Sequence, residues 1–324
     1  MTNPVVYIVG ATMAGIAVFL LLSFFFEWFE RKIVARIQKR VGPYYTGPQG
    51  VLQPFFDFMK LLLKKEKIPG EADILLYRLA PLIGVVFLTY GFLHIPFLSP
   101  EPVLSFRGDL LVIILVFAFT SFSYMLAGLS VRTPFTVLGT SRLIVQYSLY
   151  EALFLSAFAL VFLQLGSASI SGIVGYEIAG EPLVFYQPIA FAVAVFSILA
   201  KLEKPPFDLP HAKQEIAAGW MSELSSRTLA YIRLANDMDY TLSVLLVVSL
   251  FLGAGSGPYS LEIPFLWPIY FLLKALAIIL LLSYIEGIAV RIRSILLPMR
   301  LGLPLSILLA LQAALILVFK GGLV

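Results

Sequence analysis

The stretch PVVYIVGATMAGIAVFLLLSFFF, residues 4–26, is a run of apolar and small residues without a charged side chain. A helix that crosses the hydrocarbon core of a bilayer needs about 20 such residues in succession. No Lys or Arg precedes the run, whereas a cleaved signal peptide begins with a basic segment. The stretch therefore predicts a retained membrane-spanning helix at the start of the chain.

Further apolar runs continue along the chain. They centre on residues 79–97, 110–130, 143–165, 186–201, 240–256, 264–284 and 302–320. Hydrophobic residues make up 60% of the 324 residues and charged residues only 13%, whereas about a quarter of a soluble domain is charged. We therefore expect an all-α integral membrane protein with about eight transmembrane helices, in which residues 1–324 form a single polytopic domain.

The basic residues indicate how these helices are oriented. Of the 23 Lys and Arg side chains, 20 fall on one side of the expected spans and one, Lys274, falls within a span. Positively charged loops remain in the cytoplasm, so we expect both termini on the outside of the cell membrane. The basic residues flank apolar segments without a groove-reading pattern, which argues against a nucleic-acid partner despite the net charge of +4.

The residue types that hold redox centres are nearly absent. The chain has no Cys and only two His, which excludes a disulfide framework, a thiolate zinc site and an iron–sulfur cluster on this chain. The nucleotide-binding, zinc-protease and serine-hydrolase motifs are also missing. We expect no catalytic or metal-binding residue here, so the redox centre of any redox reaction belongs to a partner.

Three cytoplasmic segments are longer than simple turns. In the first, residues 27–67, ERKIVARIQKR continues a helix and VGPYYTGPQG breaks it with Pro and Gly. The following stretch, VLQPFFDFMKLLLKKE, predicts an amphipathic helix that lies in the membrane interface. Its apolar face carries Phe55, Phe58, Met59, Leu62 and Leu63, and its polar face carries Asp57, Lys60 and Lys64.

The second segment, residues 201–239, is the most acidic part of the chain. Asp208 and Pro210 are suited to open a helix, on which Glu215 and Glu223 follow with a spacing of eight. Eight helical residues turn by about 80°, so we expect both carboxylates to face one cavity, about 12 Å apart, as in a water-bridged proton relay. A solvated acidic helix is the alternative interpretation.

The fourth span contains an acid. An ionisable residue in a span is costly and usually marks an ion path or a buried partner. Glu151 lies about two turns into this span, and Arg142 precedes it by nine residues, too far for direct contact within one helix. Hydrogen bonds from neighbouring hydroxyls such as Tyr147 or Ser148 are the structural alternative for this acid.

The seventh span carries charge at its centre and at its cytoplasmic end. Lys274 lies mid-span and must face the protein interior or water, because exposure to lipid costs several kcal/mol. In the third cytoplasmic segment, IEGIAVRIRS, Glu286 lies about one turn before Arg291 and Arg293. These three side chains either belong to the functional site or reach the interface along their aliphatic stems.

Three motifs together resemble one family of the complex I superfamily, the membrane subunit that docks the peripheral arm and helps to form the quinone chamber. ERKIVARIQKRVGPYYTGPQGVLQPFFDFMKLLLKKE is similar to the first loop of that family, PPFDLPHAKQEIAAGWMSELS to its second cytoplasmic loop, and GTSRLIVQYSLYE to its acidic fourth-span motif. The resemblance implies coupling: electron transfer in the peripheral arm moves the cytoplasmic loops, changes the protonation of an acid chain and biases ion movement in antiporter-like subunits.

The resemblance also implies roles for individual residues. The expected ion-coupling residues are Glu151, Glu215, Glu223, Arg142, Lys274 and Glu286, of which the first three match acids of the family's glutamate channel. The expected interface with the peripheral arm contains Arg31, Arg36, Arg40, Asp57, Asp208, Arg291 and Arg293.

Two departures from the family pattern indicate a particular branch. The quinone-reactive branch usually has two acids after the FDxP motif, where this chain has His211 and Lys213, and a Pro-Arg motif where this chain reads IEGIAVRIRS. That string and VRTPFTVLGTSR resemble the counterpart subunit of energy-converting nickel–iron hydrogenases and membrane-bound sulfur (sulfane) reductases. The resemblance therefore implies a non-redox membrane anchor and ion-coupling subunit of an oxidoreductase complex.

This interpretation also implies the partners. They are a hydrogenase-like large subunit, an iron–sulfur small subunit and antiporter-like membrane subunits, with the iron–sulfur clusters and a nickel–iron centre in those partners and no cofactor on this chain. A quinone-site subunit of complex I is one alternative, and a freestanding secondary transporter, for which buried charges and interrupted helices are typical, is another. Carboxylates serve both H⁺ and Na⁺, so the coupled ion stays open, as does the terminal acceptor.

Overall fold

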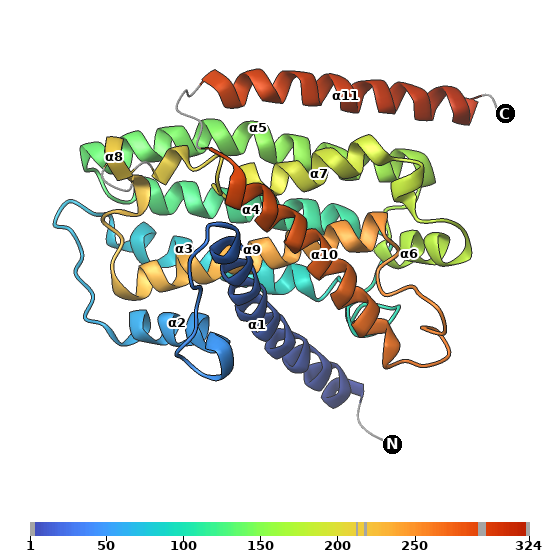
Figure 1. Ribbon diagram of the computed structural model, residues 1–324, viewed down its shortest axis with the longest axis horizontal. Helices are drawn as coiled ribbons and strands as arrows, with labels where there is room; N and C mark the ends of the chain where they lie inside the picture. Colours follow the sequence, from blue (N-terminus) through green and yellow to red (C-terminus); the bar gives the residue numbers. More distant parts are fainter. Residues whose placement is uncertain (1–3, 212, 217–218, 291–295, 322–324) are drawn as a thin grey trace.

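The described part of the chain folds into helices joined by short loops and turns. The structure, a computed structural model, describes residues 4–211, 213–216, 219–290 and 296–321. The longer helices in Figure 1 are α1 (Pro4–Ile37), α2 (Gln53–Leu63), α3 (Ile74–Phe92), α4 (Asp109–Leu129), α5 (Pro134–Leu165), α6 (Ile170–Ala179), α7 (Pro188–Lys201), α9 (Ser226–Phe251), α10 (Leu266–Ile288) and α11 (Leu296–Gly321). Short helical turns join some of them: η1 (Pro48–Gly50), η2 (Leu183–Phe185), η3 (Leu209–His211), α8 (Lys213–Ile216) and η4 (Gly219–Met221).

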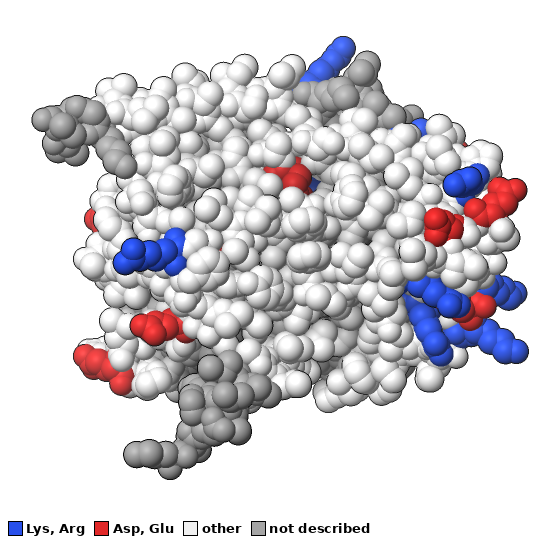
Figure 2. Space-filling view, turned by 180° about the vertical axis from the view of Figure 1, so that it is seen from behind, with Lys and Arg blue, Asp and Glu red and all other residues white. Residues whose placement is uncertain are grey.

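The expected class, an all-α integral membrane protein, is confirmed. Among the described residues, seven helices are long and apolar enough to cross a membrane: α1, α3, α4, α5, α9, α10 and α11. Figure 2 shows Lys, Arg, Asp and Glu gathered at the two ends of the molecule, with a nearly uncharged band between them. This distribution matches a molecule whose middle lies in hydrocarbon and whose ends reach water.

One expected span is shorter than the others. The run at 186–201 forms α7, which has 14 residues and is therefore about 21 Å long, less than the hydrocarbon core of about 30 Å. Pro205 and Pro206 follow within one turn of its end and oppose a longer helix, because Pro lacks an N–H and restricts the preceding residue. The C-terminal residue of α7, Lys201, is fully buried, although the charge pattern assigns it to the cytoplasmic side.

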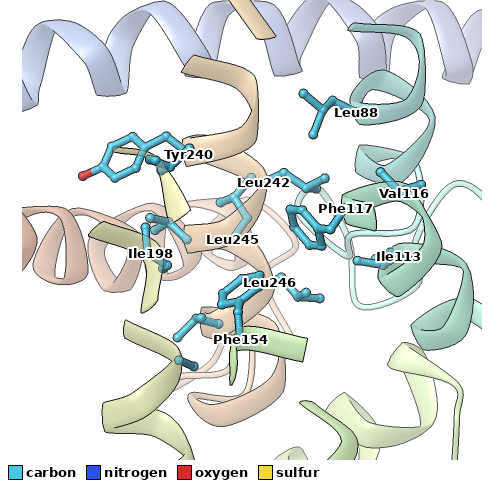
Figure 3. Packing of buried hydrophobic residues seen from close by; sticks show 14 of the residues in the cluster. Leu88, Ile113, Val116, Phe117, Phe154, Ile198, Tyr240, Leu242, Leu245 and Leu246 are labelled. Carbon is cyan, nitrogen blue, oxygen red and sulfur yellow. The ribbon is translucent and has the colours of Figure 1, made fainter. Parts of the chain in front are cut away.

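α9 forms the centre of the bundle. Every residue from Met238 to Phe251 is buried, and the helix contacts α1, α2, α3, α7 and α10. Figure 3 shows Leu242 and Leu246 of α9 close to Phe117 of α4 and Phe154 of α5, within one apolar cluster. Side chains on α9 are therefore fixed relative to most of the spanning helices.

The first half of α9 occupies part of the segment that the sequence predicts as a cytoplasmic loop. α9 begins at Ser226, so residues 226–239 are helical and the second loop is shorter than the expected 201–239. Its charged residues, Arg227, Arg233, Asp237 and Asp239, interrupt the apolar pattern. Hydropathy therefore detects only the second half of this helix.

The first cytoplasmic segment folds back along the bundle. α1 extends through the basic stretch to Ile37, as expected, and α2 occupies the expected amphipathic stretch. α2 packs against α1 and α9, and the ring centroids of Phe58 and Phe24 lie 5.9 Å apart. Phe55 and Leu63 remain exposed, which leaves apolar surface of α2 for the membrane interface.

The second cytoplasmic loop is seated on α5 through a close backbone approach. A Cβ atom on Gly139 of α5 would lie only 2.4 Å from the backbone nitrogen of Trp220. Gly219 has φ +68°, a left-handed conformation that favours glycine. Two turns along α5, Gln146 donates hydrogen bonds to the carbonyl oxygens of Ala200 (2.6 Å) and Phe207 (2.9 Å), so α5 holds the loop at both positions.

Replacing Gly139 by Ala is expected to displace the η4 turn, because the new methyl group meets backbone rather than a mobile side-chain end. We expect a destabilisation of about 1–3 kcal/mol, typical of overpacked sites, seen as a lower aggregation temperature of the solubilised membrane protein. Gly175→Ala is the matched control, since no atom lies within 4 Å of its added Cβ. Equal behaviour of the two variants contradicts this packing argument.

Candidate functional site

A buried ammonium group joins three helices in the interior of the bundle. Lys201, at the end of α7, has its Nζ 2.7 Å from Oδ1 of Asp239 on α9 and 3.8 Å from Oε2 of Glu151 on α5. Lys201 and Asp239 are fully buried, and Glu151 is 8% exposed. We call these three residues the inner charge group.

The surroundings of the inner charge group compensate for the cost of burying ions. Lys201 Nζ lies 3.6 Å from the centroid of the Phe117 ring, a cation–π distance. Ser121 donates a hydrogen bond to Glu151 (2.9 Å), and Ser243 donates one to Asp239 (3.3 Å). Each ion is thus paired or hydrogen-bonded, as buried charges require.

The group has two carboxylates for one ammonium. In a low-dielectric interior, this excess negative charge favours the binding of a proton or another cation. Glu151 also lines a mostly apolar hollow of about 340 Å³ between α4 and α5. One edge of the group therefore reaches the side of the bundle.

The partners of Glu151 differ from the two neighbours considered in the sequence. Ser148 donates to the carbonyl oxygen of Ile144 instead, and the hydroxyl of Tyr147 is buried without a hydrogen-bond partner among the described residues. The actual partners, Ser121 and Lys201, come from other helices. This acid is thus held by tertiary contacts and not by its own helix.

A large cavity lies beside the inner charge group, on the cytoplasmic side. It measures about 520 Å³ and is lined largely by charged side chains from α1, α9, α10 and the two loops: Glu27, Glu30, Arg31, Arg40, Lys204, Asp237 and Glu286. Lys204 forms an ion pair with Glu30, and Arg31 forms one with Glu27. Asp237 and Asp239 lie two positions apart on α9, so they point about 200° apart and serve the cavity and the inner charge group respectively.

The loop after α7 carries a third polar cluster. Glu203 is 4% exposed, and its Oε2 accepts a hydrogen bond from Trp220 (2.9 Å) and lies 2.7 Å from Nε2 of His211. The buried phenols of Tyr124 and Tyr147 lie within electrostatic range of Glu203, Glu151 and Asp239. The phenols therefore neighbour both the loop cluster and the inner charge group.

The expected relay between Glu215 and Glu223 does not have the helical geometry inferred from spacing. α8 ends at Ile216, and the η4 turn separates the two acids, so they do not share one helix. Glu215 is exposed and pairs with Arg142 of α5, with 2.8 Å between Nη1 and Oε2. Glu223 is half-buried, and its carbonyl oxygen accepts a hydrogen bond from Tyr77.

The remaining expected residues occupy separate places. Glu286, Arg31 and Arg40 line the charged cavity, Asp57 pairs with Arg31 (3.1 Å), Arg36 is exposed, and Asp208 is half-buried in the second loop. Arg291 and Arg293 lie outside the described residues. Two of the expected interface residues, Arg31 and Arg40, thus line the same cavity as Glu286, which the sequence predicts as an ion-coupling residue.

Lys274 lies apart from the inner charge group. Its Nζ donates to the carbonyl oxygens of Leu252 (2.6 Å), Ala254 (3.0 Å) and Ser256 (2.8 Å), in the loop that follows α9. A cation at a helix C-terminus is favourable because the carbonyl end of the helix carries partial negative charge. Lys274 therefore faces the protein interior, as expected, and binds backbone oxygens at the outer end of α9.

Comparison with known proteins places this geometry in a family. The family model for NADH dehydrogenase matches residues 10–319. The chain belongs to the NADH dehydrogenase family. The H subunit of the NADH-quinone oxidoreductase of Thermomicrobium roseum is 33% identical over 272 residues, which cover 78% of this chain and 79% of that protein. The corresponding protein of Dehalococcoides mccartyi is 34% identical over 269 residues, which cover 83% of this chain and 74% of that protein.

A solved structure has the same fold. A chain in the structure of the membrane-bound sulfane sulfur reductase (MBS), an archaeal respiratory membrane complex, matches with a TM-score of 0.84 and 23% sequence identity. The match covers 95% of this chain and 99% of that chain. The family model and the H-subunit relatives confirm the expected membership of the complex I superfamily, and the protein is a multi-pass protein of the cell membrane.

Lys201→Met is expected to destabilise the protein strongly, because it leaves the carboxylates of Asp239 and Glu151 buried without their counter-charge. Breaking a buried ion pair costs about 3–5 kcal/mol, and we expect the loss in the amount and the aggregation temperature of the solubilised protein. Adding Asp239→Asn to Lys201→Met should restore part of this stability.

Lys65→Met, at an exposed position of the first loop, is the matched control and should behave as the wild type. A double variant that is less stable than Lys201→Met alone contradicts the assignment of Asp239 as the partner of Lys201.

Proposed function

We propose that the chain is a non-redox membrane anchor and ion-coupling subunit of a respiratory complex, of the energy-converting hydrogenase or membrane-bound sulfur reductase type. It links electron transfer in a peripheral arm to the movement of H⁺ or Na⁺. The inner charge group carries this proposal, because a passive anchor does not require a buried lysine between two carboxylates from different helices. An ionisable group within spanning helices usually serves an ion path.

The tetrapeptide KLEK, residues 201–204, gives the proposal a mechanism. Lys201 pairs with Asp239, Glu203 contacts His211 and Trp220, and Lys204 pairs with Glu30 and lies 3.6 Å from the ring centroid of Tyr240. The three charged side chains of this tetrapeptide therefore each enter a different polar cluster. A movement of the second cytoplasmic loop changes all three clusters together.

The loop is the part of the chain that a peripheral arm would touch. It carries the exposed Glu215, which pairs with Arg142, and the first loop contributes Arg31 and Asp57 at the edge of the charged cavity. A redox step that alters contacts on these loops would displace the charged side chains of Glu203 and Lys204. This displacement would change the electrostatic potential at the inner charge group. Such a shift biases the protonation of the inner charge group and of acids on neighbouring subunits.

The proposed partners follow from the absence of Cys in this chain and from its resemblance to subunits of membrane-bound hydrogenases and sulfur reductases. The chain contains no Cys, so iron–sulfur clusters and any nickel–iron centre would lie in a hydrogenase-like large subunit and an iron–sulfur small subunit. Antiporter-like membrane subunits would move the ions. A freestanding transporter, the alternative from another class, should purify as a monomer or small oligomer, whereas a coupling subunit should copurify with these chains.

A quinone-site subunit of complex I is the second candidate. Two of the relatives are H subunits of NADH-quinone oxidoreductases, and the charged cavity of about 520 Å³ is large enough for a small ligand. Ligand sites for apolar rings are lined mostly by apolar and aromatic side chains, whereas seven of this cavity's twelve lining residues are charged. A photoreactive quinone analogue that labels residues 40–65 competitively would favour this candidate.

Glu151→Gln, made in the intact complex, should preserve assembly and electron transfer to an artificial acceptor while reducing ion translocation, because Asp239 keeps its ion pair with Lys201 in this variant. We expect a reduction on the order of a hundredfold, because positioned proton-transfer groups contribute at least this much. The measurement is ion uptake into sealed vesicles per electron transferred.

Glu262→Gln is the matched control, because this acid is exposed at the opposite end of the molecule. Unchanged ion translocation in Glu151→Gln would contradict the proposed coupling role.

A further inference from the structure

A second cavity lies at the outer end of the molecule, away from the charged cavity. It measures about 390 Å³ and lies between the turn that follows α6 and the loop that joins α9 to α10. Its lining residues are Glu177, Ile178, Gly180, Pro182, Ser256, Gly257, Tyr259, Ser260, Leu261 and Glu262. Leu261 and Tyr259 are more than half exposed, so the cavity has an open side.

One carboxylate in this cavity is almost completely buried. Glu177 is 3% exposed, although it lines the cavity. Its Oε1 accepts a hydrogen bond from the backbone N–H of Leu183 (2.8 Å). Its Oε2 has no partner with hydrogen-bond geometry among the described residues. A buried polar atom without a partner is rare and calls for an explanation, and the cavity beside this oxygen gives it access to the outer aqueous phase.

The loop between α9 and α10 interacts with both Glu177 and Lys274. Three carbonyl oxygens of residues 252–256 accept hydrogen bonds from Lys274 Nζ. The N–H of Gly253 in the same loop lies close enough to Glu177 to stabilise its charged form. Gly253 has φ +68°, and a Cβ there would lie 2.6 Å from Ser256 Oγ, so the loop needs glycine at this position.

We propose that this cavity is an outward-facing proton-exchange site, in which the Glu177 carboxylate binds and releases one proton from the outer aqueous phase. The proposal does not rest on the ion-coupling role of the inner charge group. It concerns a carboxylate of α6 beside the outer end of α9, which is reached through a different cavity.

A proton fits this site better than a metal ion. A hard cation such as Ca²⁺ requires six or more oxygen ligands, and the loop carbonyls beside the cavity already bind Lys274 Nζ. A proton needs only one carboxylate oxygen. Lys274 and Glu262 are the charged groups of the neighbouring α10 and loop, and Tyr259 is the other titratable side chain that lines the cavity.

The electrostatics agree with exchange near neutral pH. Burial raises the pKa of the Glu177 carboxyl to about 7, and the N–H groups of Leu183 and Gly253 together with Lys274 keep it from rising further. α6 is too short to cross the membrane, so Glu177 lies outside the spanning helices. Deprotonated Glu177 attracts Lys274 and holds the α9–α10 loop, and protonation weakens both electrostatic interactions.

The test uses the native complex in sealed, right-side-out membrane vesicles and an apolar carbodiimide, which adds to protonated carboxyl groups. The O–H proton moves to a carbodiimide nitrogen, the carboxylate oxygen bonds to the central carbon, and rearrangement leaves a stable acylurea. Peptide mass spectrometry then gives the labelled fraction of Glu177. We expect labelling to fall about tenfold when the external pH rises from about 6 to about 8, as for an acid of pKa about 7.

Changing only the internal pH should leave the labelling unchanged. Glu101→Gln, made at an exposed acid that does not line this cavity, should keep the labelling curve of Glu177. Labelling that follows internal pH, is independent of pH, or is absent at every pH overturns the proposal, as does suppression of labelling by Na⁺. The wild-type protein alone decides these outcomes, so a variant that fails to assemble does not affect the test.

A second readout separates proton binding from a purely structural role. Hydrogen exchange of the backbone amides at 252–257, corrected for the intrinsic pH dependence, should become slower as pH rises through about 7, because charged Glu177 holds this loop. In Glu177→Gln this change should disappear. A pH-dependent protection that persists in Glu177→Gln contradicts the proposal. Loss of coupling in Glu151 variants leaves both of these readouts unchanged.

Discussion

The ion pair between Lys201 and Asp239, with Glu151 beside it, constrains the interior of this protein more than any other contact. An ammonium group in an apolar bundle costs several kcal/mol unless it is paired at short range. The pair therefore requires the end of α7, the middle of α9 and the middle of α5 to meet at one point. α7 can be shorter than a full span because its charged end is satisfied inside the bundle.

The same constraint explains how the cytoplasmic loop is ordered. Once Lys201 is fixed, the next three residues place Glu203 beside His211 and Lys204 beside Glu30. Gln146 then holds the carbonyl oxygens on both sides of the KLEK segment, and Gly139 admits the backbone of η4 against α5. The loop is thus held by ion pairs and hydrogen bonds, whose strength changes when a nearby group gains or loses charge. The proposed coupling role needs a loop of this kind.

The sequence predicts the fold well and the site only in part, for a physical reason. Apolar runs locate most spans, because burial in hydrocarbon selects side chains by type. Lys201 and Asp239 escape this reasoning, since a Lys at the end of an apolar run resembles a cytoplasmic flank and Asp239 resembles a loop acid. The signal available in the sequence was Glu151: a mid-span acid needs a counter-charge, and Lys201 ends the neighbouring apolar run.

Helical spacing was a poor guide within the second loop. Glu215 and Glu223 have a favourable separation, yet Gly219 adopts a left-handed conformation between them and ends any continuous helix. The sequence places Arg142 near Glu151 along the chain, but in the structure Arg142 of α5 forms an ion pair with Glu215 of the second loop. Spacing arguments hold only where the backbone between two residues is regular, and this loop contains glycine and consecutive prolines.

The packing of the second half of α9 argues for the proposed coupling role over a freestanding channel through this chain. From Asp239 to Phe251 the helix rises about 18 Å, and every residue in this stretch is buried. Its hydroxyls at Thr241, Ser243 and Ser249 are occupied by hydrogen bonds to Asp237, Asp239 and Leu245. An ion crossing along α9 would have to leave one charged group and pass this apolar packing to reach the other. Charge can be rearranged at the middle of α9 or at its outer end at much lower cost. In the proposed coupling role, Glu151, which lines the hollow between α4 and α5, would pass the inner rearrangement to a neighbouring subunit.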